Sequence, residues 1–152
     1  MFTLQPSENL SLYLHVRSDS SVCADAMSDD QAASDPSCHF DWEGFTPFAL
    51  KTADGRFVQY GMSPAGGLTI FLACGIYAYD SDAYGTRFEF IEHDRTDYWM
   101  DVSFACQKPS DVGTCGSGVP GDFYLVYPPK GGQLDIALDA GNAIFTASKV
   151  PA

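Results

Sequence analysis

One short pattern recurs along the chain as Phe2-Thr3-Leu4, Phe48-Ala49-Leu50, Phe88-Glu89-Phe90 and Phe123-Tyr124-Leu125. Each copy places two apolar residues on either side of an unrestricted one, which is the period-two pattern of a half-buried strand. A polar turn and a second alternating run follow each copy. Copies spaced by roughly 40 residues are typical of repeated supersecondary units. The pattern therefore predicts an all-β domain of repeated hairpins, with about twelve short strands.

The composition of the 152 residues agrees with this prediction. The 14 glycines and the 14% aromatic content favour strands and tight turns over helices. Sixteen of the 20 acidic residues are Asp, which suits turns and strand ends better than helix interiors. A single domain over residues 1–152 is expected from this length.

The clearest hairpin signal joins two β-rich runs, Phe48–Thr52 and Arg56–Gly61. The dipeptide Asp54-Gly55 lies between them. Because both central residues of a type I′ turn need a positive φ, Asp-Gly is a preferred pair there. The sequence therefore predicts a type I′ hairpin at this point.

Two further runs alternate strictly between apolar and polar residues. In the run from Leu10 to Val16, the even-numbered residues are expected to face the core and the odd-numbered residues the solvent. In the run from Tyr98 to Phe104, the even-numbered residues are expected to share one face. Trp99, Asp101 and Ser103 are expected on the other face, with a turn at residues 93–96 before the run.

Residues 25–43 are the least regular part of the chain and predict a long surface loop that leads into a strand at His39–Trp42. Asp29–Ser34 could form one helical turn within that loop, which Asp35-Pro36 would end. A second loop, rich in Pro, Gly and Ser, is expected over residues 107–121.

The segment Phe48-Ala-Leu-Lys-Thr-Ala-Asp-Gly-Arg-Phe-Val58 resembles the strand–turn–strand signature of fascin-like β-trefoils, a fold shared with lectin-like members. The segment from Arg87 to Ser103 is similar to the next junction in such domains. The resemblance covers residues 2–103 and implies a β-trefoil. A calycin-like β-barrel and a β-sandwich remain the alternatives. The chain has no Gln-x-Trp motif of the ricin-type lectins.

The formal net charge of −12 limits the possible partners. Nucleic-acid binders need clustered Lys and Arg, so no nucleic-acid partner is expected. Anionic membrane surfaces and acidic actin filaments would be repelled as well. No segment approaches the roughly 20 apolar residues of a membrane span, and the first residues carry no signal peptide. The chain is therefore expected to be cytoplasmic or to derive from a trimmed secreted protein.

The five cysteines leave at least one thiol without a partner in the same chain. Cys23 and Cys38 bracket the acidic loop, and Cys106 and Cys115 bracket the Pro/Gly-rich loop. Each pair could close as a disulfide in an oxidising compartment. Cys74 lies in an apolar run and is expected to be a buried thiol.

The candidate ligand-binding residues are Asp94, Asp97, Tyr98, Trp99 and Asp101, which gather around one turn. An exposed Trp beside carboxylates can stack on a sugar ring while the acids accept hydrogen bonds from its hydroxyl groups. The alternative is that Trp99 packs in the core, as most Trp residues do. Trp42 poses the same question of core or pocket.

No catalytic residue, metal ligand or cofactor is assigned. Asp80-Ser-Asp82-Ala-Tyr-Gly85 begins like a calcium loop but departs from it at positions five and twelve. Glu89 and Glu92 are expected on opposite strand faces, so they do not form a catalytic carboxylate pair.

Three functions follow from these observations. The first is a non-enzymatic carbohydrate-binding module, whose partner is a glycan. The second is a protease-inhibitor-type module that binds a protein surface through a long loop, either Ala26–Cys38 or Lys108–Gly121. The third is a small β-barrel enzyme or carrier for an apolar compound, with a deep cavity containing Trp42 or Trp99. The oligomeric state is left open.

Overall fold

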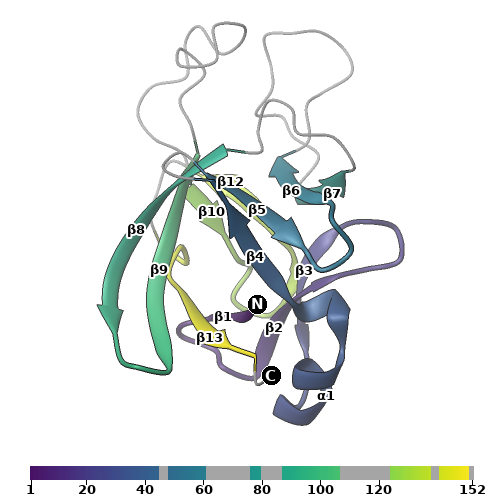
Figure 1. Cartoon of the computed structure of the whole chain (residues 1–152), viewed down its shortest axis with the longest axis horizontal. Helices are drawn as coiled ribbons and strands as arrows, with labels where there is room; N and C mark the ends of the chain where they lie inside the picture. The colour runs from purple at the N-terminus through teal and green to yellow at the C-terminus, as the bar shows by residue number, and fades with distance from the viewer. Residues whose placement is uncertain (45–47, 61–75, 80–86, 107–123, 138–140, 151–152) are drawn as a thin grey trace, which may run out of the picture.

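Antiparallel strands make up most of the residues that the structure describes, which also contain one short helix and one 3-10 turn (Figure 1). The computed structural model describes residues 1–44, 48–60, 76–79, 87–106, 124–137 and 141–150. The all-β prediction is confirmed. The elements are β1 (Phe2–Pro6), β2 (Leu12–Val16), β3 (Val22–Ala26), α1 (Asp29–Ser34), η1 (Pro36–Cys38), β4 (Phe40–Glu43), β5 (Phe48–Thr52), β6 (Phe57–Tyr60), β7 (Ile76–Tyr79), β8 (Arg87–Arg95), β9 (Trp99–Cys106), β10 (Tyr124–Val126), β11 (Gly132–Gln133), β12 (Asp135–Ala137) and β13 (Phe145–Lys149).

Six of these strands pair in a ring that closes on itself. β1 pairs with β4, β4 with β5, and β5 with β8. β8 then pairs with β9, β9 with β13, and β13 with β1. All six pairings are antiparallel. Closure removes free edges along the paired part of each strand.

The remaining strands form hairpin pairs outside the ring. β2 pairs with β3, β6 with β7, and β10 with β12. β11 adds to β3 at Gly132 and Gln133, so the β2–β3 hairpin becomes a three-stranded sheet.

Large apolar side chains fill the inside of the ring. Phe40, Phe88, Phe104 and Phe145 are all fully buried and come from four different strands. The Phe104 ring contacts the Phe88 ring with centroids 6.2 Å apart and the Phe145 ring at 5.9 Å. Each fully buried Phe contributes about 1.5–3 kcal/mol through the apolar area it removes from water. The inside of the ring is therefore a packed core.

The four Phe-led triplets do not occupy equivalent strands. The first two copies begin β1 and β5, whereas Phe88-Glu89-Phe90 lies on β8, the first strand of the β8–β9 hairpin. Tyr124 and Leu125 of the last copy lie on β10, and Phe123 is outside the described residues. A triplet reports only that a strand has one buried face, so it recurs in strands of different position.

The hairpin between β5 and β6 is present, but its turn is not type I′. Thr52 N donates to Arg56 O at 2.8 Å, and Gly55 N donates to Thr52 O at 3.0 Å. Gly55 has a φ of +88°, whereas Asp54 does not have a positive φ. The loop therefore has three residues and a single left-handed glycine, the other common hairpin geometry. The Asp54 carboxylate accepts from Thr52 Oγ1 at 2.5 Å and stabilises this turn.

The alternation predicted for Leu10–Val16 holds only in part. Leu12, Leu14 and Val16 are buried, but Leu10 precedes β2 and is 55% exposed. Tyr13 was expected in solvent and is only 6% exposed. It packs in a second small core with Ala32 and Cys38, which the α1–η1 segment brings over the outer face of β2.

The acidic segment after β3 is folded rather than an extended loop. Ser28 caps α1 by accepting from Gln31 N at 3.1 Å, and the Gln31 side chain accepts from Ser28 N at 3.0 Å. This reciprocal pair is a capping box, which satisfies two backbone donors at once. Asp35 ends the helix and caps η1 in turn. Residues Ala26–Cys38 therefore contain a capped helix and a 3-10 turn instead of an irregular loop, and most of them remain exposed.

Cys23 and Cys38 are free and buried, so the disulfide considered for this pair is not formed. The Cys38 thiol contacts Met27 Sδ at 3.2 Å, whereas Cys23 Sγ lies 3.4 Å from Ser21 Oγ. The Cys23 and Cys38 thiols lie in different surroundings, because the folded α1–η1 segment packs Cys38 against Met27. Cys74 and Cys115 lie outside the described residues.

β8 is longer than the sequence suggested. It continues to Arg95, through a register shift between Glu92 and Asp94, so the turn predicted at residues 93–96 begins later. Tyr98 falls in that turn and is 80% exposed, instead of facing the core with Met100 and the residues after it.

Ser103 was expected on the same face of β9 as Trp99 and Asp101, and it is 3% exposed. His93 lies beside it on β8, with its Nε2 2.9 Å from Ser103 Oγ, and helps to cover it. The described residues contain no helix with the length and apolarity needed to cross a membrane. The calcium-like segment Asp80–Gly85 and the loop Lys108–Gly121 both lie outside the described residues.

Candidate functional site

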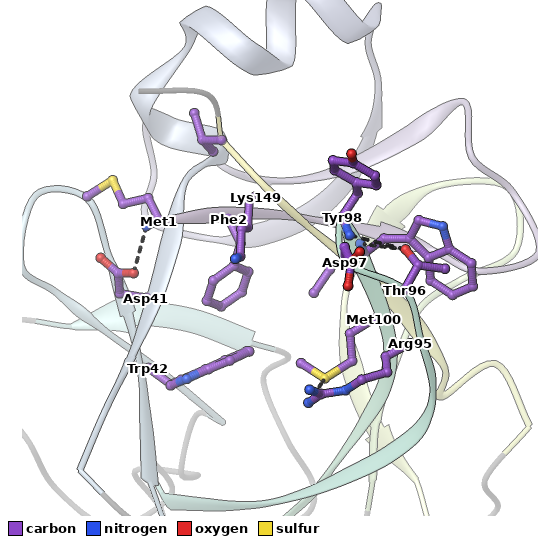
Figure 2. Close-up of a pocket in the computed structure, with 13 residues that line it drawn as sticks. Met1, Phe2, Asp41, Trp42, Arg95, Thr96, Asp97, Tyr98, Met100 and Lys149 are labelled. Atoms are coloured by element: carbon purple, nitrogen blue, oxygen red, sulfur yellow. Dashed lines mark hydrogen bonds and ion pairs between the residues drawn. The ribbon is translucent and has the colours of Figure 1, made fainter.

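A pocket of about 630 Å³ lies at one end of the strand ring. We call it the mouth pocket. Four segments line it: the start of β1, the middle of β4, the β8–β9 turn with its flanks, and the end of β13. The register brings these segments together, because Phe2 pairs with both Phe40 and Lys149, and Ser148 pairs with Trp99. Figure 2 shows Trp42 and Phe2 on one side of the pocket and the turn that carries Asp97 and Tyr98 on the other.

Trp42 is held in place by two neighbouring rings. Its centroid lies 4.3 Å from that of Phe2 and 5.1 Å from that of Phe90. Tilted and edge-to-face contacts at these distances stabilise aromatic pairs by about 0.5–1.5 kcal/mol each. Trp42 is nevertheless 38% exposed, so part of its ring faces the pocket. Trp42 is therefore a pocket residue and does not belong to the closed core.

The β8–β9 turn owes its shape to Thr96. Thr96 Oγ1 accepts from the backbone N of Tyr98 and of Trp99, both at 3.2 Å. Thr96 N donates to Trp99 O at 2.8 Å and closes the turn. A Thr hydroxyl that bonds backbone two and three residues ahead is a common way to fix a tight turn. The aromatic side chains of Tyr98 and Trp99 are therefore presented by a backbone with defined geometry.

Charges of both signs line the pocket. Arg95 is engaged, because its Nε bonds Glu92 and its Nη2 lies 3.5 Å from Met100 Sδ. Asp97 and Lys149 are exposed and make no ion pair or side-chain hydrogen bond with another described residue. These two groups are therefore open to a ligand.

Three of the five residues predicted for the site lie together in the mouth pocket, namely Asp97, Tyr98 and Trp99. Asp94 and Asp101 do not line it. They face each other as a cross-strand pair between β8 and β9, and Asp101 Oδ1 accepts from Thr146 Oγ1 at 2.7 Å. These two carboxylates lie before and after the turn, on paired strands outside the pocket.

Proximity along the sequence could not indicate the residues of the opposite wall of the pocket. Phe2, Asp41 and Lys149 line it, and they come from strands far apart along the chain. Only the ring pairing brings them near residues 95–100. Trp42 was considered as either a core or a pocket residue, and nothing in its sequence surroundings indicated the other wall of the pocket.

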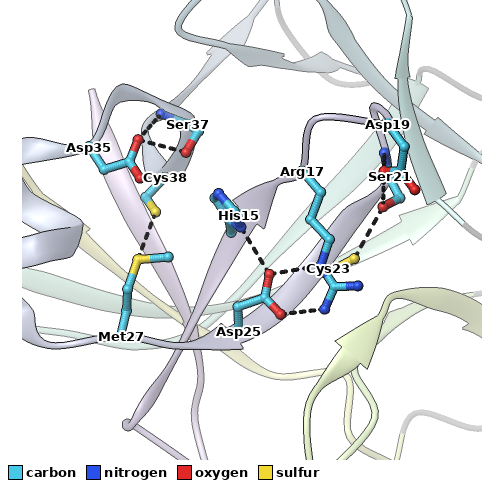
Figure 3. Close-up of polar contacts among 10 residues, drawn as sticks. All are labelled: His15, Arg17, Asp19, Ser21, Cys23, Asp25, Met27, Asp35, Ser37 and Cys38. Atoms are coloured by element: carbon cyan, nitrogen blue, oxygen red, sulfur yellow. Dashed lines mark hydrogen bonds and ion pairs between the residues drawn. The ribbon is translucent and has the colours of Figure 1, made fainter.

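A second group of polar side chains lies on the outer face of the β2–β3 hairpin, and Figure 3 shows Asp25 between His15 and Arg17. Asp25 accepts from Arg17 Nη2 at 2.5 Å and from Arg17 Nε at 3.1 Å. His15 Nδ1 lies 2.9 Å from the same carboxylate. The Arg17 guanidinium holds the pKa of Asp25 below its usual range. The group ties β2 to β3, and its charges are already paired.

Within the described ranges, no three His, Cys, Asp or Glu side chains are arranged to hold a metal ion. Burial raises the pKa of the Cys38 thiol to about 11 and that of Cys23 above its ordinary value. Reactive cysteines have a lowered pKa, so neither thiol is prepared to act as a nucleophile.

No model of a known protein family matches the sequence, and no curated protein matches it either. The case for a function therefore rests on the geometry of the mouth pocket.

Proposed function

We propose that the chain is a β-trefoil that acts as a non-enzymatic, carbohydrate-binding module. The support for the fold is the order of the paired strands. The ring strands are β1 and β4, β5 and β8, and β9 and β13. The first two couples are each separated in sequence by one outer hairpin, and the third by the β10–β12 pair together with β11. That is three units, each giving its first and last strand to the ring. A calycin-like up-and-down barrel would instead pair strands that are neighbours in sequence.

One observation carries the ligand class. The mouth pocket combines exposed aromatic rings with a carboxylate that has no partner among the described residues. The C–H face of a sugar stacks on such rings, while its hydroxyl groups donate to a carboxylate. Trp42 and Tyr98 supply exposed rings on opposite sides, and Asp97 supplies the acceptor.

The pocket also suits a sugar in size and charge. A volume of about 630 Å³ falls within the range of small-molecule sites. Asp97 and Lys149 give it one open charge of each sign, so it has no strong preference for an anion or a cation. A neutral ligand with many hydroxyl groups can bond both side chains. The packed core inside the ring counts against the third alternative, a carrier with a deep apolar cavity.

The experiment is a glycan array followed by a titration of intrinsic Trp fluorescence with the glycans that bind. Asp97→Asn is expected to weaken binding on the order of tenfold, because it replaces a charged acceptor by a neutral one. Trp42→Ala is expected to abolish detectable binding. Asp94→Asn is the matched control, since Asp94 lies on the same hairpin outside the pocket, and it should leave binding within about twofold of the wild type.

An array without hits at high protein concentration would sink the proposed ligand class. Hits that Asp97→Asn and Trp42→Ala leave unchanged would show that a glycan binds elsewhere, and the proposed site would then be wrong.

A further inference from the structure

The outer edge of β8 is open beyond the ring. β8 pairs with β5 only at Arg87 and Phe88, whereas its pairing with β9 continues to Arg95. Among the described residues, Ile91–Arg95 therefore have a strand partner on one side only. In Figure 1 β8 lies on the outer side of the β8–β9 hairpin, and β9 pairs with β13 on the inner side. An unpaired strand edge carries a row of backbone donors and acceptors that can pair with another chain.

This edge is also accessible at the level of side chains. Every residue from Ile91 to Tyr98 is exposed. Ile91 is an apolar side chain with 37% of its surface exposed, and Glu92 and Arg95 have side-chain exposures of 39% and 67%. The edge therefore offers one apolar contact among polar groups.

The charge on the edge is acidic. Glu92 and Asp94 lie on the edge itself, and Asp101 lies across from Asp94 on β9. Arg95 is the cation of the segment, and Glu92 already pairs with it. Like charges along an edge prevent two copies of one protein from pairing edge to edge. A second copy of this chain, with its net charge of −12, would bring acids against acids.

We propose that the β8 edge from Ile91 to Arg95 docks an extended, basic peptide segment of another protein, which adds to the sheet as a further strand beside β8. Main-chain hydrogen bonds supply affinity in this mode, and side chains at alternate positions supply specificity. Lys or Arg residues of the peptide lie over Glu92 and Asp94, and an apolar residue contacts Ile91. This site adjoins the mouth pocket at Arg95, which lines that pocket, and goes beyond the proposed carbohydrate binding.

The probe is a synthetic peptide of alternating lysine and threonine, titrated by NMR into isotope-labelled protein at physiological ionic strength. Binding is expected to protect backbone amides of Ile91–Arg95 from hydrogen exchange. The same peptide with all its amides N-methylated keeps every charge but has no donors for the edge, so it should bind at least about tenfold more weakly. Equal binding of the two peptides would overturn strand addition, since charge attraction alone would then explain the result.

Two double variants separate the edge from the overall charge. Glu92→Gln with Asp94→Asn is expected to weaken peptide binding on the order of tenfold. Glu8→Gln with Asp30→Asn changes the net charge by the same amount at exposed positions on other elements and should leave the affinity within about twofold. Equal weakening of peptide binding by both double variants would contradict the proposal. Protection from hydrogen exchange that is confined to amides outside β8 would contradict it as well.

The outcome is independent of the carbohydrate proposal. Trp42→Ala should leave peptide binding unchanged, and Asp94→Asn alone should leave glycan binding unchanged, because Asp94 neither lines the mouth pocket nor pairs with Arg95, as Glu92 does. Loss of peptide binding in Trp42→Ala would show that the peptide occupies the mouth pocket, and the edge assignment would be wrong.

Discussion

Tyr13 shows how a single polar group adapts to burial. The ring is 6% exposed, and its hydroxyl donates to Asp29 Oδ1 at 2.5 Å. Burial, with Asp29 as a further cause, raises the pKa of Tyr13 to about 12. The hydroxyl therefore stays protonated and joins β2 to the first turn of α1.

Tyr13→Phe is expected to destabilise the protein by about 1 kcal/mol, because it removes this hydrogen bond and leaves the ring packing intact. Urea denaturation of the two proteins measures the difference. Tyr98→Phe is the control, since Tyr98 is 80% exposed and makes no side-chain hydrogen bond among the described residues. A Tyr13→Phe protein as stable as Tyr98→Phe would show that the contact with Asp29 adds nothing.

Asp94 and Asp101 form a cross-strand pair of like charge. Acids directly opposite each other on paired strands repel, and the cost is a few tenths of a kcal/mol up to about 1 kcal/mol. Asp94→Asn should therefore stabilise the protein by about 0.5 kcal/mol, while its side-chain oxygen still accepts from Arg95 N as Asp94 Oδ1 now does at 2.8 Å.

Denaturation at low and high salt checks this explanation, because salt screens charges at the surface and should shrink the gain. Asp97→Asn is the comparison, since Asp97 lies in the turn and has no acid paired opposite it. A gain that does not depend on salt, or the same gain in Asp97→Asn, would rule out relief of the Asp94–Asp101 repulsion.

At the scale of elements, α1 is too short to be stable alone and depends on its cap and on packing against β2. Ser28→Ala removes one half of the capping box and is expected to cost about 1 kcal/mol. If the segment opens locally, Cys38 becomes accessible, so its alkylation rate should rise about fivefold.

Peptide-level mass spectrometry after a short alkylation pulse measures this rate, with buried Cys23 on β3 as the internal reference. Ser34→Ala is the matched control, because Ser34 Oγ only bonds back to carbonyls of its own helix at 3.0 and 3.3 Å. Faster labelling of Cys23 as well would indicate global unfolding, which would contradict a local role for the cap.

At the scale of the whole molecule, acid should unfold the protein through its bonded carboxylates. Arg17 first, and then His15, hold the pKa of Asp25 below its ordinary 3.8 by hydrogen bonding. A depressed folded-state pKa means that the unfolded chain binds the proton first as the pH falls. The stability from Asp25 is therefore fully present above about pH 4–5 and is lost as the pH falls from about 4 through the folded-state pKa.

The free energy of unfolding from urea titrations, at steps from about pH 6 to about pH 2.5, checks this prediction. Asp25→Asn should be less stable at neutral pH and should lose less stability on acidification, because Asn has no proton to take up. Asp54→Asn is the matched variant, because hydrogen bonds from Arg56 and Thr52 hold the pKa of Asp54 below its ordinary value on a separate turn. Identical pH profiles for Asp25→Asn and the wild type would mean that Asp25 is not linked to folding.

The high strand content and the positions of several strands along the chain could be predicted from the sequence. β5 begins and ends as its pattern indicated, because period-two alternation is a local property of the chain. The errors fell at strand ends and on faces. Tyr98 moved into a turn that Thr96 fixes, and Tyr13 was covered by a segment that a pattern limited to β2 cannot show.

The candidate site divides in the same way. Local clustering along the chain identified Asp97, Tyr98 and Trp99, because one turn holds all three. Asp94 and Asp101 were grouped with them by proximity in sequence, yet the strand pairing turns them away from the pocket.

The sequence by itself determined that this protein is an acidic, all-β chain with acids and aromatic residues gathered beside one turn, since composition and alternation depend on nothing beyond neighbouring residues. Only the tertiary structure decided which strands close the ring and which part of the β8 edge has no strand partner among the described residues. It also decided that Phe2, Asp41 and Lys149 face that turn across a pocket. These relations depend on pairings between residues far apart along the chain, and no local pattern encodes the partner of a strand.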